Sequence, residues 1–134
     1  MIDPVFVKEI RRRTSLIGFF YKNYLEFMRA KENPKASEML WGILNNQAWL
    51  IGKLFFETDV RGHSEAINTI RMILALKQVD LINNVSDANT IHRNFFHNEL
   101  SDVDFERYRN SVEDLMRGLD KILTDKFKEE GLSP

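Results

Sequence analysis

The sequence contains no cysteine. Neither a disulfide framework nor a thiolate metal site is therefore open to it. It also has no run of about 18 apolar residues that could span a membrane, and its amino terminus lacks the basic and then apolar pattern of a signal peptide. From these absences we expect a cytoplasmic protein that does not associate with membranes.

An excess of charge of one sign is lacking as well, because the formal net charge is only -1. The chain as a whole is not attracted to nucleic acid, so any contact with RNA has to rest on a local basic patch. The one basic run, Arg11-Arg12-Arg13, could form such a patch. A solvated helix face is the commoner explanation for three adjacent charges.

Most catalytic motifs are missing too. The sequence has no His-Glu-x-x-His, no repeated Glu-x-x-His, no Gly-x-Ser-x-Gly and no Gly-rich phosphate loop. The acidic residues Asp102, Asp104 and Glu106 lack the glycine and the final glutamate of a calcium loop, and acids are favourable at a helix start. We therefore expect neither a metal nor a cofactor.

The sequence is rich in helical periodicity. Its 134 residues, 43% of them hydrophobic, are enough for one domain, 1–134, with its own core. No segment alternates like a strand, so the predicted class is all-α, an antiparallel helical bundle of four to five helices with the second and last as core walls. The helices are expected at about Asp3–Glu32, Ser37–Glu57, Ser64–Asn84, Asp87–Glu99 and from Ser101 onward, each begun by a capping residue.

Side chains suited to catalysis collect in the segment from Asp87 to Glu99, which holds two of the three histidines. If it is helical, Arg93 and His97 are four residues apart and lie on one face, about 5 to 6 Å apart at Cβ. An arginine can hold a phosphate by two parallel hydrogen bonds, and a histidine can move a proton near neutral pH. The pair suits metal-free RNA cleavage, in which a base deprotonates the ribose 2′-OH and the arginine stabilises the phosphoryl charge.

The structural alternative for Arg93 and His97 is a surface pair bonded to acids such as Glu99 or Asp102. The other two histidines also have structural interpretations. His92 points about 100° away from Arg93 around the helix and is interpreted as a neighbour.

His63 stands alone in a segment with loop composition, and is interpreted as an exposed or capping residue. The amides of Asn45-Asn46-Gln47 could read a ligand or join a buried polar network, with capping of nearby backbone as the commoner role.

The stretch from Thr90 to Asn98, followed by Leu100 to Phe105 and a long terminal helix, resembles the end of a HEPN domain. HEPN domains are helical bundles of about this size, and many are metal-independent endoribonucleases of toxin–antitoxin, defence or RNA-processing systems. Their signature is Arg, a polar residue that is often Asn, a few further residues and then His.

The resemblance implies that Arg93 contacts the scissile phosphate, that Asn94 supports it, and that His97 is the general acid or base. It covers about the last third of the chain. Three residues separate Arg93 from His97, fewer than active members usually place there.

The resemblance further implies RNA as substrate, a homodimer in which two motifs line one cleft, and a neutralising antitoxin as protein partner. A hypothesis from another class is a non-catalytic protein–protein interaction module. It is motivated by aromatic residues spread too widely round their helices for one core to cover, namely Phe19, Phe20, Tyr21, Tyr24, Phe27, Phe55 and Phe56.

Overall fold

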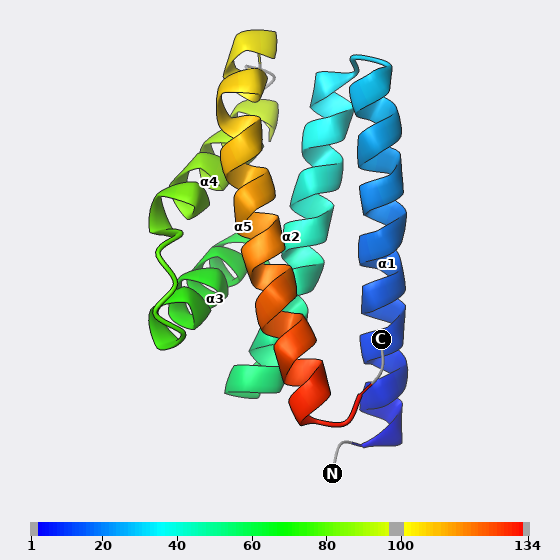
Figure 1. Ribbon diagram of the computed structural model, residues 1–134. Coiled ribbons are helices and arrows are strands. Elements are labelled where there is room, and N and C mark those ends of the chain that lie inside the picture. The colour runs from blue at the N-terminus through cyan, green and yellow to red at the C-terminus, as the bar shows by residue number, and fades with distance from the viewer. Residues whose placement is uncertain (1–2, 97–100, 133–134) are drawn as a thin grey trace.

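Five α-helices make up the computed structural model, which describes residues 3–96 and 101–132 (Figure 1). They are α1 (Pro4–Arg29), α2 (Asn33–Phe56), α3 (His63–Leu76), α4 (Ile82–Phe96) and α5 (Asp102–Glu129). The described ranges contain no strand, so the predicted all-α helical bundle is confirmed. None of the described helices is both long and apolar enough to cross a membrane.

Helix α2 occupies the centre of the bundle and packs against each of the other four. Helix α1 packs mainly on α2, at the outer edge, and its buried Tyr24 donates a hydrogen bond to Glu113 of α5 at 2.9 Å, whereas α3 and α4 cover the other side (Figure 1). The pairs α1–α2 and α4–α5 are antiparallel, but α2 and α5 run in the same direction. They do so because α3 and α4 return the chain to the end of the bundle where α2 begins.

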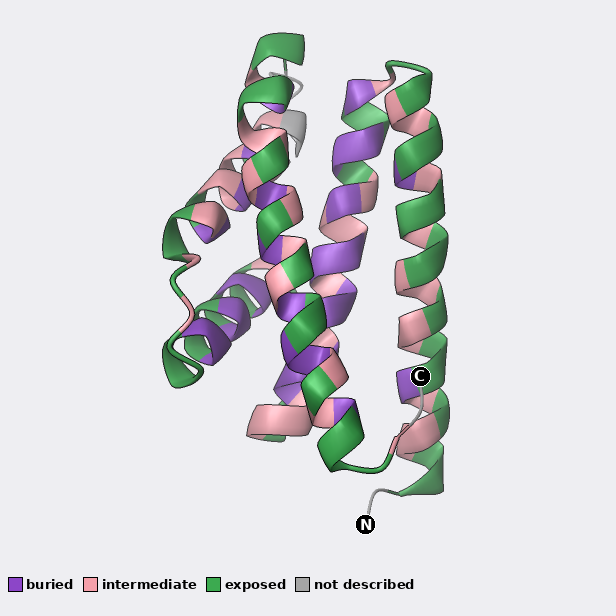
Figure 2. Ribbon diagram, in the orientation of Figure 1, coloured by how far each residue is buried: buried purple, intermediate pink, exposed green. Residues whose placement is uncertain are grey.

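The core follows the stripes predicted on the second and last helices. Figure 2 shows the buried residues facing inward along α2, α3 and α5, while the outer side of α1 is exposed. The walls consist of Leu40, Ile43, Leu44, Ala48, Leu50 and Ile51 on α2 and of Phe105, Val112, Leu115, Leu119 and Leu123 on α5.

Two helix starts were predicted by their caps and are confirmed. Asp3 Oδ1 accepts a hydrogen bond from the N–H of Val5 at 2.7 Å, ahead of Pro4. Ser101 Oγ accepts from the N–H of Asp104 at 3.1 Å. Both caps satisfy N–H groups that have no partner within the helix.

The prediction that the third helix continues to Asn84 is wrong. Helix α3 ends at Leu76, and Gln78 adopts the left-handed conformation with a φ of 54°. The N–H of Val79 bonds to the carbonyl of Leu74 at 2.9 Å, and that of Gln78 to Ala75 at 3.2 Å, which is the Schellman pattern of a helix end.

The expected cap at Asp87 is also wrong, because Asp87 lies inside α4. Its carboxylate accepts a hydrogen bond from the Ser111 hydroxyl at 2.6 Å, and Asn84 Nδ2 donates to the Ser111 carbonyl at 2.9 Å. These polar residues attach α4 to α5. The helical structure is interrupted near Gln78 instead. Helix α4 therefore begins before Asp87 and is longer than predicted.

Candidate functional site at the junction of α2, α3 and α4

The last turns of α4 carry the predicted arginine and asparagine. Val85, Ala88 and Ile91 are buried and fix one face of α4 on the bundle. Arg93 lies off that face and is exposed, and Asn94 is half-buried. Arg93 is therefore held on a packed helix with its guanidinium accessible to a ligand.

The predicted partner of Arg93, His97, lies outside the described residues, as does Glu99. Asp102, the other acid considered for this pair, accepts a hydrogen bond from Asn33 Nδ2 at 2.9 Å. Within the described residues Arg93 has no ion pair and no side-chain hydrogen bond. The alternative in which Asp102 neutralises Arg93 is thus not what the structure contains.

The other two histidines lie together. The rings of His63 and His92 stack with centroids 4.3 Å apart and an interplanar angle of 18°. Each ring centroid also lies 4.5 Å from that of Trp41. Because Trp41 is on α2, His63 on α3 and His92 on α4, the three aromatic rings join three helices at one point; we call these residues the histidine–tryptophan cluster.

The cluster corrects one sequence interpretation. His63 was expected to be an exposed or capping residue of a loop, but it is the half-buried first residue of α3. His92 was interpreted as a neighbour that points away from Arg93, and its ring packs against Trp41 and His63. The ring contacts among His63, His92 and Trp41 join residues far apart in the sequence. No local pattern around either histidine therefore signals them.

His63 is oriented by Asn89, one helical turn before Arg93. The distance from His63 Nε2 to Asn89 Oδ1 is 2.6 Å. With the amide oxygen facing the ring, Nε2 carries the proton, because a carboxamide oxygen only accepts. The other ring nitrogen, Nδ1, is buried and has no hydrogen-bond partner among the described residues.

His92 has an altered protonation equilibrium. Burial lowers the pKa of His92 below its ordinary value, and the neighbouring charge of His63 lowers it further. Because its pKa lies below the ordinary value of about 6.5, His92 is neutral at physiological pH and adds no positive charge to the cluster.

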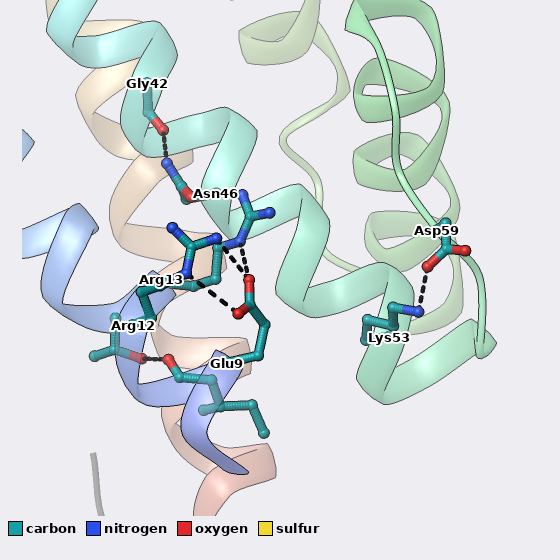
Figure 3. A network of polar contacts seen from close by, with 9 residues as sticks. Glu9, Arg12, Arg13, Gly42, Asn46, Lys53 and Asp59 are labelled. Carbon is teal, nitrogen blue, oxygen red and sulfur yellow. Dashed lines mark hydrogen bonds and ion pairs between the residues drawn. The ribbon is translucent and has the colours of Figure 1, made fainter. Parts of the chain in front are cut away.

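The arginines of the basic run do not form an open patch. Glu9 accepts hydrogen bonds from Arg12 at 2.7 Å and from Arg13 at 3.2 Å (Figure 3). Arg13 also donates to Asn46 Oδ1 on α2 at 3.0 Å, and its guanidinium lies 4.3 Å from the ring centroid of Trp49. Two of the three arginines are therefore engaged in pairing, and Arg13 joins α1 to α2.

The amides of the predicted polar segment also serve packing. Asn46 Nδ2 donates to the Gly42 carbonyl at 2.8 Å, completing the network with Arg13 (Figure 3). Gln47 Nε2 donates to the Met116 carbonyl at 3.0 Å and links α2 to α5. Of the roles considered for this segment, the structure supports a buried polar network and backbone bonding.

The described residues contain no group of three His, Asp or Glu side chains placed to hold a metal ion. No protein-family model, no curated protein and no solved structure matches the chain. What the bundle does must therefore follow from its own residues and their geometry.

Proposed function

We propose that the bundle binds RNA and cleaves it without a metal, at a site centred on Arg93, Asn94 and His97. The observation that carries the proposal is the accessible Arg93 guanidinium, which has no acidic partner in the described part of the chain. It stands on a helix fixed by Val85 and Ile91. An exposed arginine on a packed helix, with no ion pair among the described residues, is suited to bind a phosphodiester by two parallel hydrogen bonds.

The proposed reaction is a transesterification within the RNA. A general base removes the proton of a ribose 2′-OH, and the 2′ oxygen attacks the adjacent phosphorus. The bond from phosphorus to the 5′ oxygen of the next nucleotide breaks, and a general acid protonates that oxygen. The products are a 2′,3′-cyclic phosphate and a 5′-hydroxyl.

Arg93 stabilises the negative charge that develops on the phosphoryl oxygens, and Asn94 supports its contact. His97 supplies the base or the acid. A second copy of the motif supplies the other role when two chains form a homodimer around one cleft. A toxin–antitoxin or defence system, with a neutralising antitoxin as partner, is the proposed setting.

The test is incubation of RNA with the purified protein in EDTA, beside Arg93→Ala, His97→Ala and the control Arg11→Ala, followed by analysis of the RNA ends. Arg11 is exposed on α1, so its replacement removes the same charge elsewhere. We expect cyclic phosphate ends from the wild type and the control but from neither site variant. Cleavage that survives in both site variants with unchanged helicity would remove this site from the reaction.

A second candidate function, an interaction module, is favoured by the exposed apolar side chains of α1. Phe19 is 59% exposed, Tyr21 42% and Leu25 38%. Tyr21 and Leu25 are four residues apart and share a helix face, which α2 leaves uncovered. We propose that a second copy of the chain covers this face. Leu25→Ser should then give a monomer in sedimentation, while a dimer that persists in Leu25→Ser with native helicity would exclude the face.

A further inference from the structure

A cleft of about 300 Å³ opens beside the histidine–tryptophan cluster, between α3 and α4. Six residues line it: His63, Ser64, Ile67, Asn68 and Arg71 from α3 and Asn89 from α4. On α3 the polar residues recur every three or four positions, so they share one face of the helix. The cleft therefore has a polar lining supported by two packed helices.

The lining has one charge, and it is positive. Arg71 is exposed and has no ion pair with any residue that the structure describes. The acids of α3 and α4 face other partners, since Glu65 accepts the Arg61 N–H at 2.9 Å and Asp87 accepts the Ser111 hydroxyl at 2.6 Å. With a cation and no carboxylate in its lining, the cleft favours an anion.

The neutral residues of the lining supply hydrogen-bond donors. Asn89 Oδ1 is engaged by the His63 ring at 2.6 Å, which leaves the Asn89 NH₂ group to donate. Asn68 adds a second amide and Ser64 a hydroxyl. An arginine guanidinium, two amides and a hydroxyl offer several hydrogen-bond donors. They suit the several acceptor oxygens of a phosphoryl group better than they suit a single-atom anion such as chloride.

We propose that this cleft binds the phosphoryl group of a nucleotide or of an RNA strand, with Arg71 as its main ligand and Ser64, Asn68 and Asn89 as supporting donors. Binding at the cleft does not depend on the cleavage proposed above. Asn89 and Arg93 are one helical turn apart on the same side of α4, so a strand held at the cleft passes close to Arg93.

The experiment is an NMR titration with inorganic phosphate at constant pH and ionic strength, following the ring signals of His63. The three histidines are distinguished by single His→Asn variants. We expect a saturable shift of the His63 signals, and binding about tenfold weaker in Arg71→Ala because a charged hydrogen-bonding partner is lost. Arg11→Ala is the control, because it removes one exposed arginine from α1. A shift that does not saturate, or equal affinities in the two variants, overturns the proposal.

Two further ligands distinguish the sources of the phosphoryl group. Adenosine monophosphate and a short oligoribonucleotide are titrated into the His97→Ala variant, in which the proposed cleavage is blocked. Tighter binding of the oligonucleotide, weakened by Arg71→Ala, identifies an RNA strand as the ligand; equal affinities identify a free nucleotide. If the wild type binds phosphate but cleaves no RNA, this proposal stands and the proposed function is contradicted. If the wild type cleaves RNA but its phosphate binding does not depend on Arg71, the proposed function stands and this proposal is contradicted.

Discussion

The two sides of the bundle differ in how their arginines are paired, although Arg11 on α1 is exposed and has no ion pair among the described residues. On the α1–α2 side, Arg12 and Arg13 pair with Glu9, and Arg13 reaches Asn46 and Trp49 (Figure 3). On the α3–α4 side, single arginines stand exposed with no described acidic partner. A run of basic residues in sequence thus does not by itself indicate an open basic patch, because two of these three arginines are paired within the fold.

The largest expected effect comes from removing the ring that joins α2 to the histidine side. Trp41→Ala should lower the free energy of unfolding by about 3 kcal/mol, because a packed aromatic ring is replaced by a methyl group. Trp49→Ala, which removes a ring that packs on Phe6 at 6.2 Å, is the matched control. In urea unfolding both lose stability, but only Trp41→Ala should move the NMR signals of His63 and His92. Histidine signals unmoved by Trp41→Ala would show that the three rings are not coupled.

A smaller loss is expected from Arg13→Ala on the paired side. The variant loses the hydrogen bond to Asn46 and the contact with the Trp49 ring, together about 1 to 2 kcal/mol of unfolding free energy. Arg12→Ala should be indistinguishable from wild type, because Arg12 is exposed and its ion pair with Glu9 is solvated. Equal losses in the two variants by urea unfolding would contradict a joining role for Arg13.

A pH dependence of stability is expected from His92. Because its pKa is lowered in the folded state, the unfolded chain binds the proton more readily, and stability must fall as the pH falls. The contribution is fully present above the unfolded pKa of about 6.5 and is lost as the pH falls through the lower folded pKa. Unfolding free energies at about pH 7.5 and about pH 5.5 should therefore differ less in His92→Asn than in wild type; an equal difference would assign the dependence to other groups.

A similarly small effect on stability is expected at Arg71 and Arg93, which are exposed and have no ion pair among the residues that the structure describes. Arg71→Ala and Arg93→Ala should stay within about 0.5 kcal/mol of wild type, because each side chain is exposed without a described ion pair. Their circular dichroism and urea midpoints are the measurement. A loss well above this size in Arg93→Ala would indicate a structural role and would compromise its use as a catalytic probe.

The sequence predicts much of this fold, because its signals are local. The caps at Asp3 and Ser101 and the apolar stripe of α5 each depend on residues close together in the sequence, and all three predictions are confirmed. The sequence does not signal the end of α3 at Leu76, since the left-handed residue that follows it is Gln78, whereas a glycine there would have indicated a helix end. Leu81 and Ile82 continue an apolar pattern across this break.

The candidate site is predictable only in part, for a related reason. Arg93 is predicted from its spacing to His97 along one helix; it is exposed on α4, and its site with His97 stays a prediction because His97 lies outside the described residues. The cluster of His63, His92 and Trp41 depends on three helices meeting, and Arg71 matters because Glu65 and Asp87 have other partners. No local sequence pattern signals the three-ring cluster or the absence of a described acidic partner for Arg71.

The most direct measurement is the salt dependence of RNA binding in single arginine variants, with His97→Ala as the background to prevent cleavage. Each phosphate contact of a single strand contributes about 0.7 to the slope of log affinity against log salt. Arg93→Ala and Arg71→Ala should each reduce the slope by about that amount, and Arg12→Ala should leave it unchanged. Equal slopes for all variants would show that Arg71 and Arg93 bind no phosphate and would contradict both proposed sites.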